Sequence, residues 1–161
     1  MKILVAYYSR TGTTKKVGET IAKHLNADSD EIIDLKKRLG LRPIRWLAAG
    51  MDAKREKLTK IEVKKNPEKY DLVVVGTPAW ANNIAPAVRT YLTNHNWAKK
   101  KVGIFCTAGG DHVEKPLAEV ERLTKKSVII GRVGVSSKEI KIGNYEGKIT
   151  SFVKILKKSK T

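Results

Sequence analysis

Four hydroxyl side chains and one glycine lie close together near the start of the chain, at Ser9, Thr11, Gly12, Thr13 and Thr14. They follow an apolar run at residues 3–8 and precede a segment in which Val17, Ile21 and Leu25 recur at helical spacing. The first N–H groups of a helix have no partner within the helix, and the helix dipole favours negative charge beside them. Hydroxyl donors, with a glycine that lets a ligand approach the backbone, therefore predict a phosphate-binding loop.

A tryptophan, Trp80, follows the apolar run 72–76 and is surrounded by small or polar residues: Thr77, Pro78, Ala79, Ala81, Asn82 and Asn83. Because such neighbours are too small to bury an indole, we expect this segment to be a loop in which the ring offers a flat surface to a planar heterocycle. The alternative interpretation is that Trp80 only covers the edge of the core.

A third polar segment follows the apolar run 102–106 and consists of Thr107, Ala108, Gly109, Gly110, Asp111 and His112. Two consecutive glycines permit the backbone to come close to the edge of a ring. By itself the segment is also consistent with an ordinary turn. His112 has two interpretations, a neighbour of the bound ring or an exposed loop histidine.

Apolar runs alternate with helical periodicity along the whole chain. We expect five strands, at residues 2–8, 31–35, 72–76, 102–106 and 127–135. The later helical faces contain Ile84, Val88, Tyr91 and Leu92, then Leu117, Val120 and Leu123, and finally Tyr145, Ile149, Phe152, Val153 and Leu156. Almost continuously apolar strands that alternate with helices are typical of an α/β fold, with a parallel sheet covered on both faces. No linker or repeat interrupts the pattern, so we expect a single domain over residues 1–161.

The segment between residues 36 and 70 is the least regular part of the chain. Pro43 is expected to begin a helix that contains Trp46, and residues 64–69 are expected to form a loop. In open parallel sheets, ligands bind beyond the carboxyl ends of the strands. The segments that follow the first, third and fourth expected strands should therefore converge on one site.

Together the three segments resemble the flavodoxin family of FMN-binding proteins. The motif Ser9-x-Thr11-Gly12-x-Thr14 is similar to the family's phosphate loop, and residues 76–80 and 105–111 are similar to the two loops that flank its flavin ring. The resemblance covers nearly the whole chain and is to the short-chain type. It implies a three-layer sandwich whose five-stranded parallel sheet has the order 2-1-3-4-5.

The same resemblance implies a noncovalent FMN. Its phosphate would be held by Ser9, Thr11, Gly12, Thr13 and Thr14, and its ring would stack on Trp80 between the segments 77–83 and 107–112. Arg10, the one charged residue of the first segment, belongs to this cofactor-binding set and is expected to point to solvent.

Two features of these segments depart from the family's pattern. No glycine lies between Thr77 and Asn83, although a glycine there assists the backbone movement that often accompanies flavin reduction. The third segment has no second aromatic residue to cover the outer face of the ring. His112 is the nearest flat side chain, and Trp46 is a remote candidate.

Other chemistry has little support in the sequence. Cys106, the single cysteine, ends an apolar run and is expected to be a buried core residue, and no residues have the spacing of a metal site. No nucleophile motif of a hydrolase occurs, so we assign no catalytic residues.

The chain has 33 Lys and Arg against 16 Asp and Glu, a formal charge of +17. Such a surface could bind an acidic protein partner, anionic lipid or nucleic acid, or it is simply a solvated surface; the aromatic pattern of a nucleic-acid-binding surface is lacking. No apolar run could span a membrane, so we expect no membrane insertion and a soluble, cytoplasmic protein.

We expect a flavodoxin that shuttles electrons between redox partners, such as acidic iron–sulfur proteins or a reductase. The alternative is an FMN-dependent reductase of quinones or similar small acceptors that uses NAD(P)H. A third interpretation is a module without redox function that keeps the fold but binds another phosphate-bearing ligand, or nucleic acid through its lysines.

Overall fold

A parallel sheet forms the centre of the computed structural model, which describes residues 1–37 and 41–159. Its strands follow the order β2-β1-β5-β7-β8, and every neighbouring pair in this order is parallel. The strands are β2 (Asp28–Glu31), β1 (Ile3–Tyr7), β5 (Leu72–Trp80), β7 (Lys101–Ala108) and β8 (Val128–Ser136). The predicted parallel sheet in the order 2-1-3-4-5 is confirmed.

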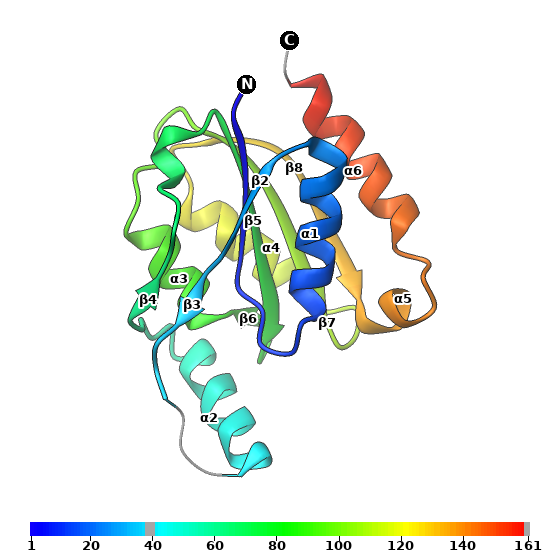
Figure 1. Cartoon of the computed structure of the whole chain (residues 1–161). Helices are drawn as coiled ribbons and strands as arrows, with labels where there is room; N and C mark the ends of the chain where they lie inside the picture. The colour runs from blue at the N-terminus through cyan, green and yellow to red at the C-terminus, as the bar shows by residue number, and fades with distance from the viewer. Residues whose placement is uncertain (38–40, 160–161) are drawn as a thin grey trace.

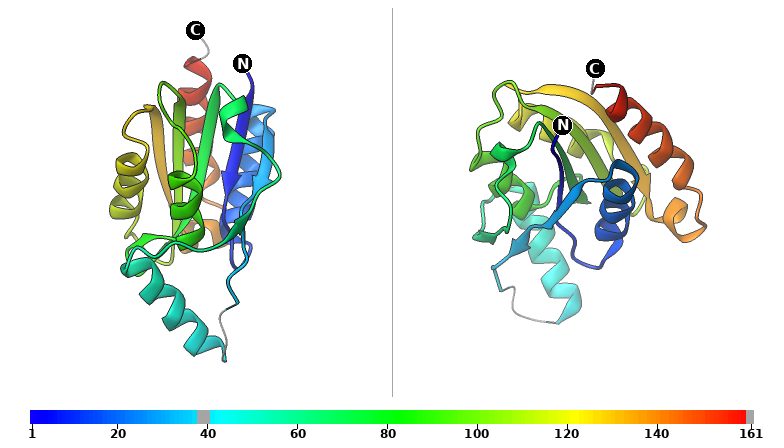
Figure 2. Two further views of the ribbon diagram at one scale, coloured as in Figure 1. Left: turned by 90° about the vertical axis from the view of Figure 1, so that its left-hand side faces the viewer. Right: turned by 45° about the horizontal axis from the view of Figure 1, so that its top comes forward.

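Helices cover both faces of this sheet (Figures 1 and 2). One face packs against α1 (Thr13–Leu25) and α6 (Glu146–Lys158), and the other against α3 (Pro86–Thr93) and α4 (Glu114–Leu123). Successive strand residues point to opposite faces, so Leu4 and Ala6 belong to one half of the core and Val5 to the other. The almost continuously apolar strands follow from this double coverage.

The first, third and fourth predicted strands coincide with β1, β5 and β7, and the fifth coincides with β8. Strand β5 and strand β7 approach closely at Gly76 and Phe105, which are partners in register. A Cβ atom on Gly76 would lie 2.0 Å from Cζ of Phe105, so the phenyl ring occupies the space that any side chain there would need.

The prediction of a second strand at residues 31–35 was wrong. The strand that pairs with β1 is the polar segment β2, and residues 33–34 form β3 (Ile33–Asp34), which pairs antiparallel with β4 (Ile61–Glu62). Because β2 lies at the edge of the sheet, it tolerates polar residues. Asp30 is buried there because its carboxylate accepts the backbone N–H groups of Lys64 and Lys65.

The expected helical position of Ile84 was also wrong, as was the loop expected after β5. The strand continues to Trp80, turns at Ala81 and Asn82, and returns as the antiparallel strand β6 (Asn83–Ile84). Both turn residues have positive φ, 47° and 58°. Helix α3 starts only at Pro86, a residue that suits a first helical turn.

The remaining elements are short or lie outside the layers. The segment predicted as a loop at 64–69 contains a 3-10 turn, η1 (Pro67–Lys69), and α5 (Ser137–Lys141) follows β8 directly. The predicted helix at Pro43 is confirmed as α2 (Arg42–Lys54), which projects beyond the carboxyl edge of the sheet (Figures 1 and 2). The N-terminus and the end of α6 lie toward the opposite edge (Figure 1). Among the described residues, no helix has the length and apolar character needed to cross a membrane.

Candidate functional site

The loop between β1 and α1 forms an open cradle at the start of the helix. Gly12 is the N-cap residue and adopts a left-handed backbone conformation, with φ 93° and ψ −9°. Its N–H group donates to Oγ of Ser9 at 3.1 Å, which closes the loop. The first turn of α1 contains no acidic residue, and no heavy atom lies within 4 Å of the position that a Cβ on Gly12 would take. The positive end of the helix is therefore accessible to an anion.

The threonines of this loop have different surroundings. Thr11 is exposed and Thr13 is half-buried, and their hydroxyl oxygens are 3.3 Å apart. Thr14 is buried, and its hydroxyl forms a 2.8 Å hydrogen bond with the hydroxyl of Thr107. This bond ties the phosphate-type loop directly to the end of β7.

The three sequence-predicted segments converge on one hollow of about 150 Å³ at the carboxyl edge of the sheet. Its lining includes Arg10, Thr11, Thr13 and Thr14 from the first segment, Pro78, Ala79 and Trp80 from the second, and Thr107, Ala108 and Gly109 from the third. The hollow is smaller than typical ligand pockets, which enclose roughly 300–1,000 Å³. Arg10 is one of the residues that line it.

Arg10 lies against two indole rings. The carbon at the centre of its guanidinium is 5.2 Å from the centroid of Trp80 and 5.1 Å from that of Trp46. These distances are typical of cation–π contacts. The expectation that Arg10 points to solvent was therefore wrong, because the sequence does not show that two aromatic rings stand beside the loop.

Trp46 reaches the hollow because α2 packs on the end of β5 and on β6. Ala49 and Ala53 are buried in that contact, and Gly50 faces the turn at Ala81. The sequence named Trp46 only as a remote candidate, whereas the structure makes it a wall of the hollow. The opposite part of the rim carries no aromatic residue among the described residues of the third segment, and Gly109 is exposed there.

Trp80 itself is held in place from two sides. Its ring meets the ring of Tyr8 edge to face, with centroids 5.4 Å apart. Its backbone pairs with Asn83 of β6, whose side-chain oxygen accepts hydrogen bonds from the Arg89 guanidinium at 3.1 Å and from the backbone N–H of Ile84 at 2.8 Å. Arg89 thereby anchors the hairpin that carries the indole.

A buried ion pair fixes Arg89 in turn. Its guanidinium lies 2.6 Å from the carboxylate of Glu119 on α4. Hydrogen bonds from Arg122 and from Arg89 hold the pKa of Glu119 below its ordinary value. Glu119 therefore remains ionised at neutral pH and keeps the arginine paired.

Several sequence-predicted residues lie outside the lining of this hollow. Thr77 is buried, and its hydroxyl accepts the backbone N–H of Ala85 at 3.2 Å. Thr77 and Asn83 thus stabilise the chain reversal after β5, while Ala81 and Asn82 are exposed in the turn. Gly110 and Asp111 line a neighbouring hollow beside Glu139, and His112 is exposed.

Ser137 is a residue of the hollow that the sequence analysis missed. It opens α5 and donates its hydroxyl to the backbone oxygen of Ala108 at 3.1 Å. The one local signal is the capping box formed by Ser136 and Glu139, which marks a helix start at the end of β8. Because β8 neighbours β7, that helix start lies beside the third segment.

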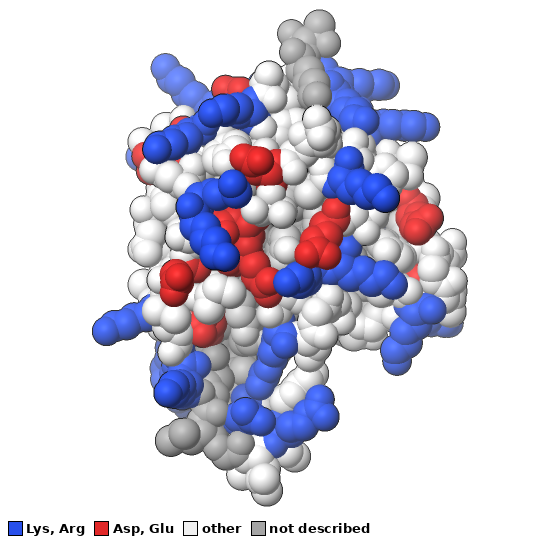
Figure 3. Space-filling view, viewed as in Figure 1, with Lys and Arg blue, Asp and Glu red and all other residues white. Residues whose placement is uncertain are grey.

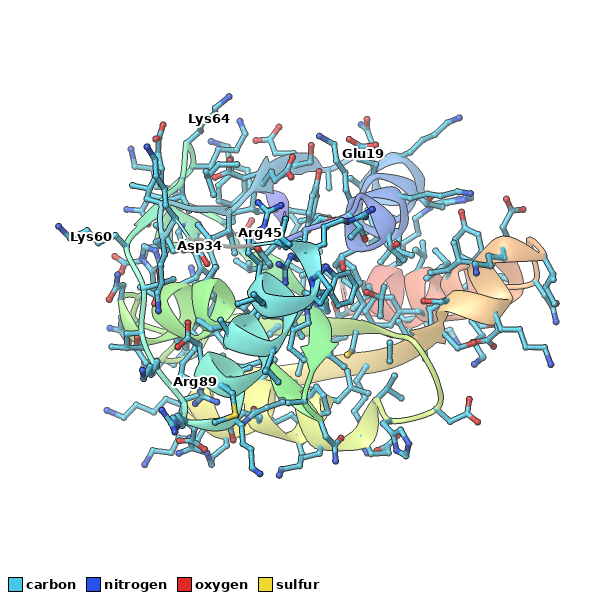
Figure 4. The ribbon with its side chains drawn as sticks, turned by 90° about the horizontal axis from the view of Figure 1, so that it is seen from below. Glu19, Asp34, Arg45, Lys60, Lys64 and Arg89 are labelled. Carbon is cyan, nitrogen blue, oxygen red and sulfur yellow. The ribbon has the colours of Figure 1, made fainter. Side chains whose placement is uncertain are left out.

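A second hollow, of about 290 Å³, adjoins the first on the side of α2. Its lining consists of Arg10, Thr11, Arg42, Arg45 and Trp46. Figure 4 looks onto this edge of the molecule and shows Arg45 near one end of α2 and Arg89 near the other. The site therefore combines neutral hydroxyl donors, two indole rings and several guanidinium groups.

The expectation for Cys106 is confirmed, because its side chain is fully buried and burial raises the pKa of its thiol to about 12. No cluster of three or more His, Cys, Asp or Glu side chains suitable for a metal ion occurs among residues 1–37 and 41–159.

Comparisons with known proteins give a consistent result. The family model described as Flavodoxin matches residues 2–134. The crystal structure of a flavoprotein in complex with FMN from Lactobacillus acidophilus NCFM is 21% identical, with a TM-score of 0.72, and the match covers 87% of this chain and 96% of that one. A search of curated proteins found no match.

Two further solved structures represent different activities on this fold. A short-chain flavodoxin associated with a PDU bacterial microcompartment is 16% identical, with a TM-score of 0.61 and full coverage of both chains. An NADH:FMN oxidoreductase is 14% identical, with a TM-score of 0.62, and the match covers 96% of this chain and 87% of that one. At these identities the likeness shows the shared fold alone.

Proposed function

This chain belongs to the flavodoxin family of FMN-binding proteins, and we propose that it transfers electrons between redox partners through a bound FMN. The observation that supports this proposal is the convergence of a phosphate-type loop, an indole wall and a glycine segment on one hollow. The flavin supplies the capacity to take up and release electrons when it is bound. The protein binds it, orients it and controls its access to water.

The phosphate loop fits an FMN phosphate. The free N–H groups at the start of α1 and the hydroxyls of Ser9, Thr11 and Thr13 are neutral donors around an open space. Because Gly12 leaves that space clear, the phosphate can approach the backbone closely. The hydroxyl of Thr14, bonded to Thr107, aligns this loop with the end of β7.

The walls for the ring are also present. We propose that the isoalloxazine stacks on Trp80 and that the edge of the flavin ring lies along Ala108 and Gly109. The Arg10 guanidinium then moves away from the Trp80 indole. Trp46 then shields the same region from water. Because Arg89 holds the hairpin, the plane of Trp80 stays fixed. This limits the structural rearrangement of the site when the bound flavin is reduced.

The test is a visible absorption spectrum after FMN is added and the excess is removed, followed by stepwise anaerobic reduction. We expect a bound flavin spectrum with quenched fluorescence. Trp80→Ala should weaken FMN binding by about tenfold or more, since stacking on an aromatic side chain contributes about 1–3 kcal/mol per ring. Ile155→Ala, at a half-exposed residue of α6 outside the hollow, is the control variant. Loss of FMN from the unmodified protein on washing would refute the proposal.

The charge of +17 favours acidic electron-transfer partners, such as iron–sulfur proteins or a reductase. Opposite charges accelerate association, and salt screens this attraction. We therefore expect the rate of electron transfer to an acidic partner to fall as ionic strength rises. A rate that does not change with salt would contradict docking through charge.

A second candidate function is an FMN-dependent reductase that passes electrons from NAD(P)H to quinones or similar small acceptors. It is favoured by the exposed glycines of the third segment, which leave the outer side of the hollow open. The discriminating measurement is NAD(P)H oxidation by the purified, FMN-loaded protein with a quinone and no other protein. Steady turnover would assign the enzyme activity, and its absence across a series of quinones would favour the carrier.

A further inference from the structure

Helix α2 projects from the body of the protein at the edge that carries the site (Figures 1 and 2). Residues 41–48, which comprise its N-cap and first two turns, are all exposed. The helix contacts the rest of the chain through Ala49, Asp52 and Ala53, which are buried. More than half of this helix is therefore exposed, although Trp46 contacts Arg10 on the side of the hollow.

The exposed side of α2 is apolar. Ile44, Leu47 and Met51 are 59%, 69% and 38% exposed, and their spacing places them on one face of the helix. Leu41, the exposed N-cap residue, comes three residues before Ile44, and Leu58 is exposed four residues after the helix ends. We call these five side chains the α2 stripe. Trp46 lies on another side of the helix, toward the hollow, so the stripe is not part of the site.

Cations on α2 or just after it are Arg42, Arg45, Lys54, Arg55 and Lys57, and the first two also line the second hollow. Among the described residues, no carboxylate lies within ion-pair distance of the first four. Asp52, the one acidic residue of α2, is buried and pairs with Lys36 and Lys57. Figure 3 shows this end of the molecule as blue and white surface, with the red side chains of the view lying above it.

The charges decide which occupant the stripe fits. A second copy of the chain would bring the same stripe and the same cations face to face, between molecules that each carry +17. An anionic surface instead attracts the flanking cations. Because α2 projects from the body of the protein, the stripe suits a deformable layer into which its side chains can insert.

We propose that α2 is a membrane-surface helix, which lies in the interface of an anionic bilayer with its stripe among the acyl chains. Amphipathic helices with Lys and Arg beside large apolar residues bind in this way, and long cationic side chains extend to the headgroups. Each Lys or Arg near the surface adds attraction to acidic lipids. The proposal goes beyond the redox function and does not rest on it, and it requires no spanning helix.

A fluorophore at one position of the stripe tests the proposal directly. Cys106 is buried, so Leu47→Cys can be labelled selectively with a nitrobenzoxadiazole group, whose emission rises in an apolar environment. Ile155→Cys on α6, also half exposed, is the matched control. The labelled full-length chains are mixed with vesicles of phosphatidylcholine and phosphatidylglycerol in equal parts, or of phosphatidylcholine alone.

With anionic vesicles, we expect emission to rise at position 47 and not at position 155. Binding to the neutral vesicles should be at least about tenfold weaker, because they lack the negative headgroups that attract the Lys and Arg side chains. Unlabelled protein should float with anionic vesicles in a density gradient. The double variant Ile44→Ser and Leu47→Ser should not, although its circular dichroism is unchanged, because both side chains are exposed.

Three results would overturn the proposal. The first is constant emission at position 47 with anionic vesicles. The second is a rise that depends on protein concentration without lipid, which would assign the stripe to a second copy. The third is an emission at position 47 that rises with soluble polyglutamate but not with vesicles, which would assign the stripe to an acidic protein partner.

Discussion

Replacing Gly12 by alanine separates backbone strain from steric crowding in the phosphate loop. Gly12 has φ 93°, and no heavy atom lies within 4 Å of the position of an added Cβ. The new methyl group therefore meets nothing, and the whole cost comes from holding an alanine in a left-handed conformation. That cost is about 1–2 kcal/mol.

The cost must appear in one of two measurements. If the loop keeps its conformation without FMN, the free energy of unfolding of the apoprotein falls by that amount. If the loop relaxes instead, FMN must restore the strained conformation on binding, and Kd rises by a factor of about 5–30. The sum of the two losses should stay close to about 1–2 kcal/mol.

Two other glycines serve as matched controls. Gly143 also has a positive φ, 74°, with open space around it, but lies outside the site. Gly143→Ala should therefore destabilise the apoprotein without changing FMN affinity. Gly147 in α6 has open space and no positive φ, so Gly147→Ala should not destabilise the protein.

Urea unfolding of the apoproteins and FMN titration by fluorescence quenching provide both quantities. The reasoning fails if Gly12→Ala changes neither quantity while Gly143→Ala destabilises the protein. It also fails if Gly143→Ala weakens FMN binding as strongly as Gly12→Ala does, since the loss would then be unrelated to the phosphate loop.

Three further predictions concern Glu119, Gly76 and Cys106. Glu119→Leu leaves the buried guanidinium of Arg89 without its closest partner and should lower the free energy of unfolding at neutral pH by about 3 kcal/mol in urea denaturation. Because folding lowers the pKa of Glu119, this stabilisation is complete above its unfolded pKa and is lost as the pH falls through the folded pKa. The difference between the two proteins should therefore shrink in acid, and a constant difference would contradict the pairing. Gly76→Ala places a Cβ 2.0 Å from Cζ of Phe105 and should cost about 3 kcal/mol by overpacking, so an unchanged Tm would show that the ring moves freely. The thiol of Cys106, buried and with a pKa of about 12, should react with an aromatic disulfide reagent at neutral pH only after denaturant is added, and rapid reaction of the native protein would disprove its burial.

The alternation of strands and helices could be predicted because periodicity is a local property of the chain. The apolar runs of β1, β5 and β7 are nearly continuous, since helices cover both of their faces. The phosphate loop was visible for the same reason. The donors at the start of α1, the glycine and the hydroxyls are neighbours in sequence, so their chemistry does not depend on distant packing.

The polar edge strand β2 could not be predicted in this way. Strand β1 supplies the backbone hydrogen bonds of β2. The polar side chains of β2 are hydrated or accept backbone N–H groups from residues 64 and 65. The same holds for the hairpin that carries Trp80, where Ala81 and Asn82 adopt positive φ without a glycine signal.

The composition of the hollow depended on contacts between segments far apart in the chain. Arg10 is adjacent to the phosphate loop, but its position was decided by Trp46 and Trp80. Trp46 arrives only because α2 packs beyond the edge of the sheet, and Ser137 only because β8 lies beside β7. Local spacing determines which backbone groups a ligand can meet at one loop. The side chains that surround that ligand are fixed by the packing of elements against one another, which local spacing does not encode.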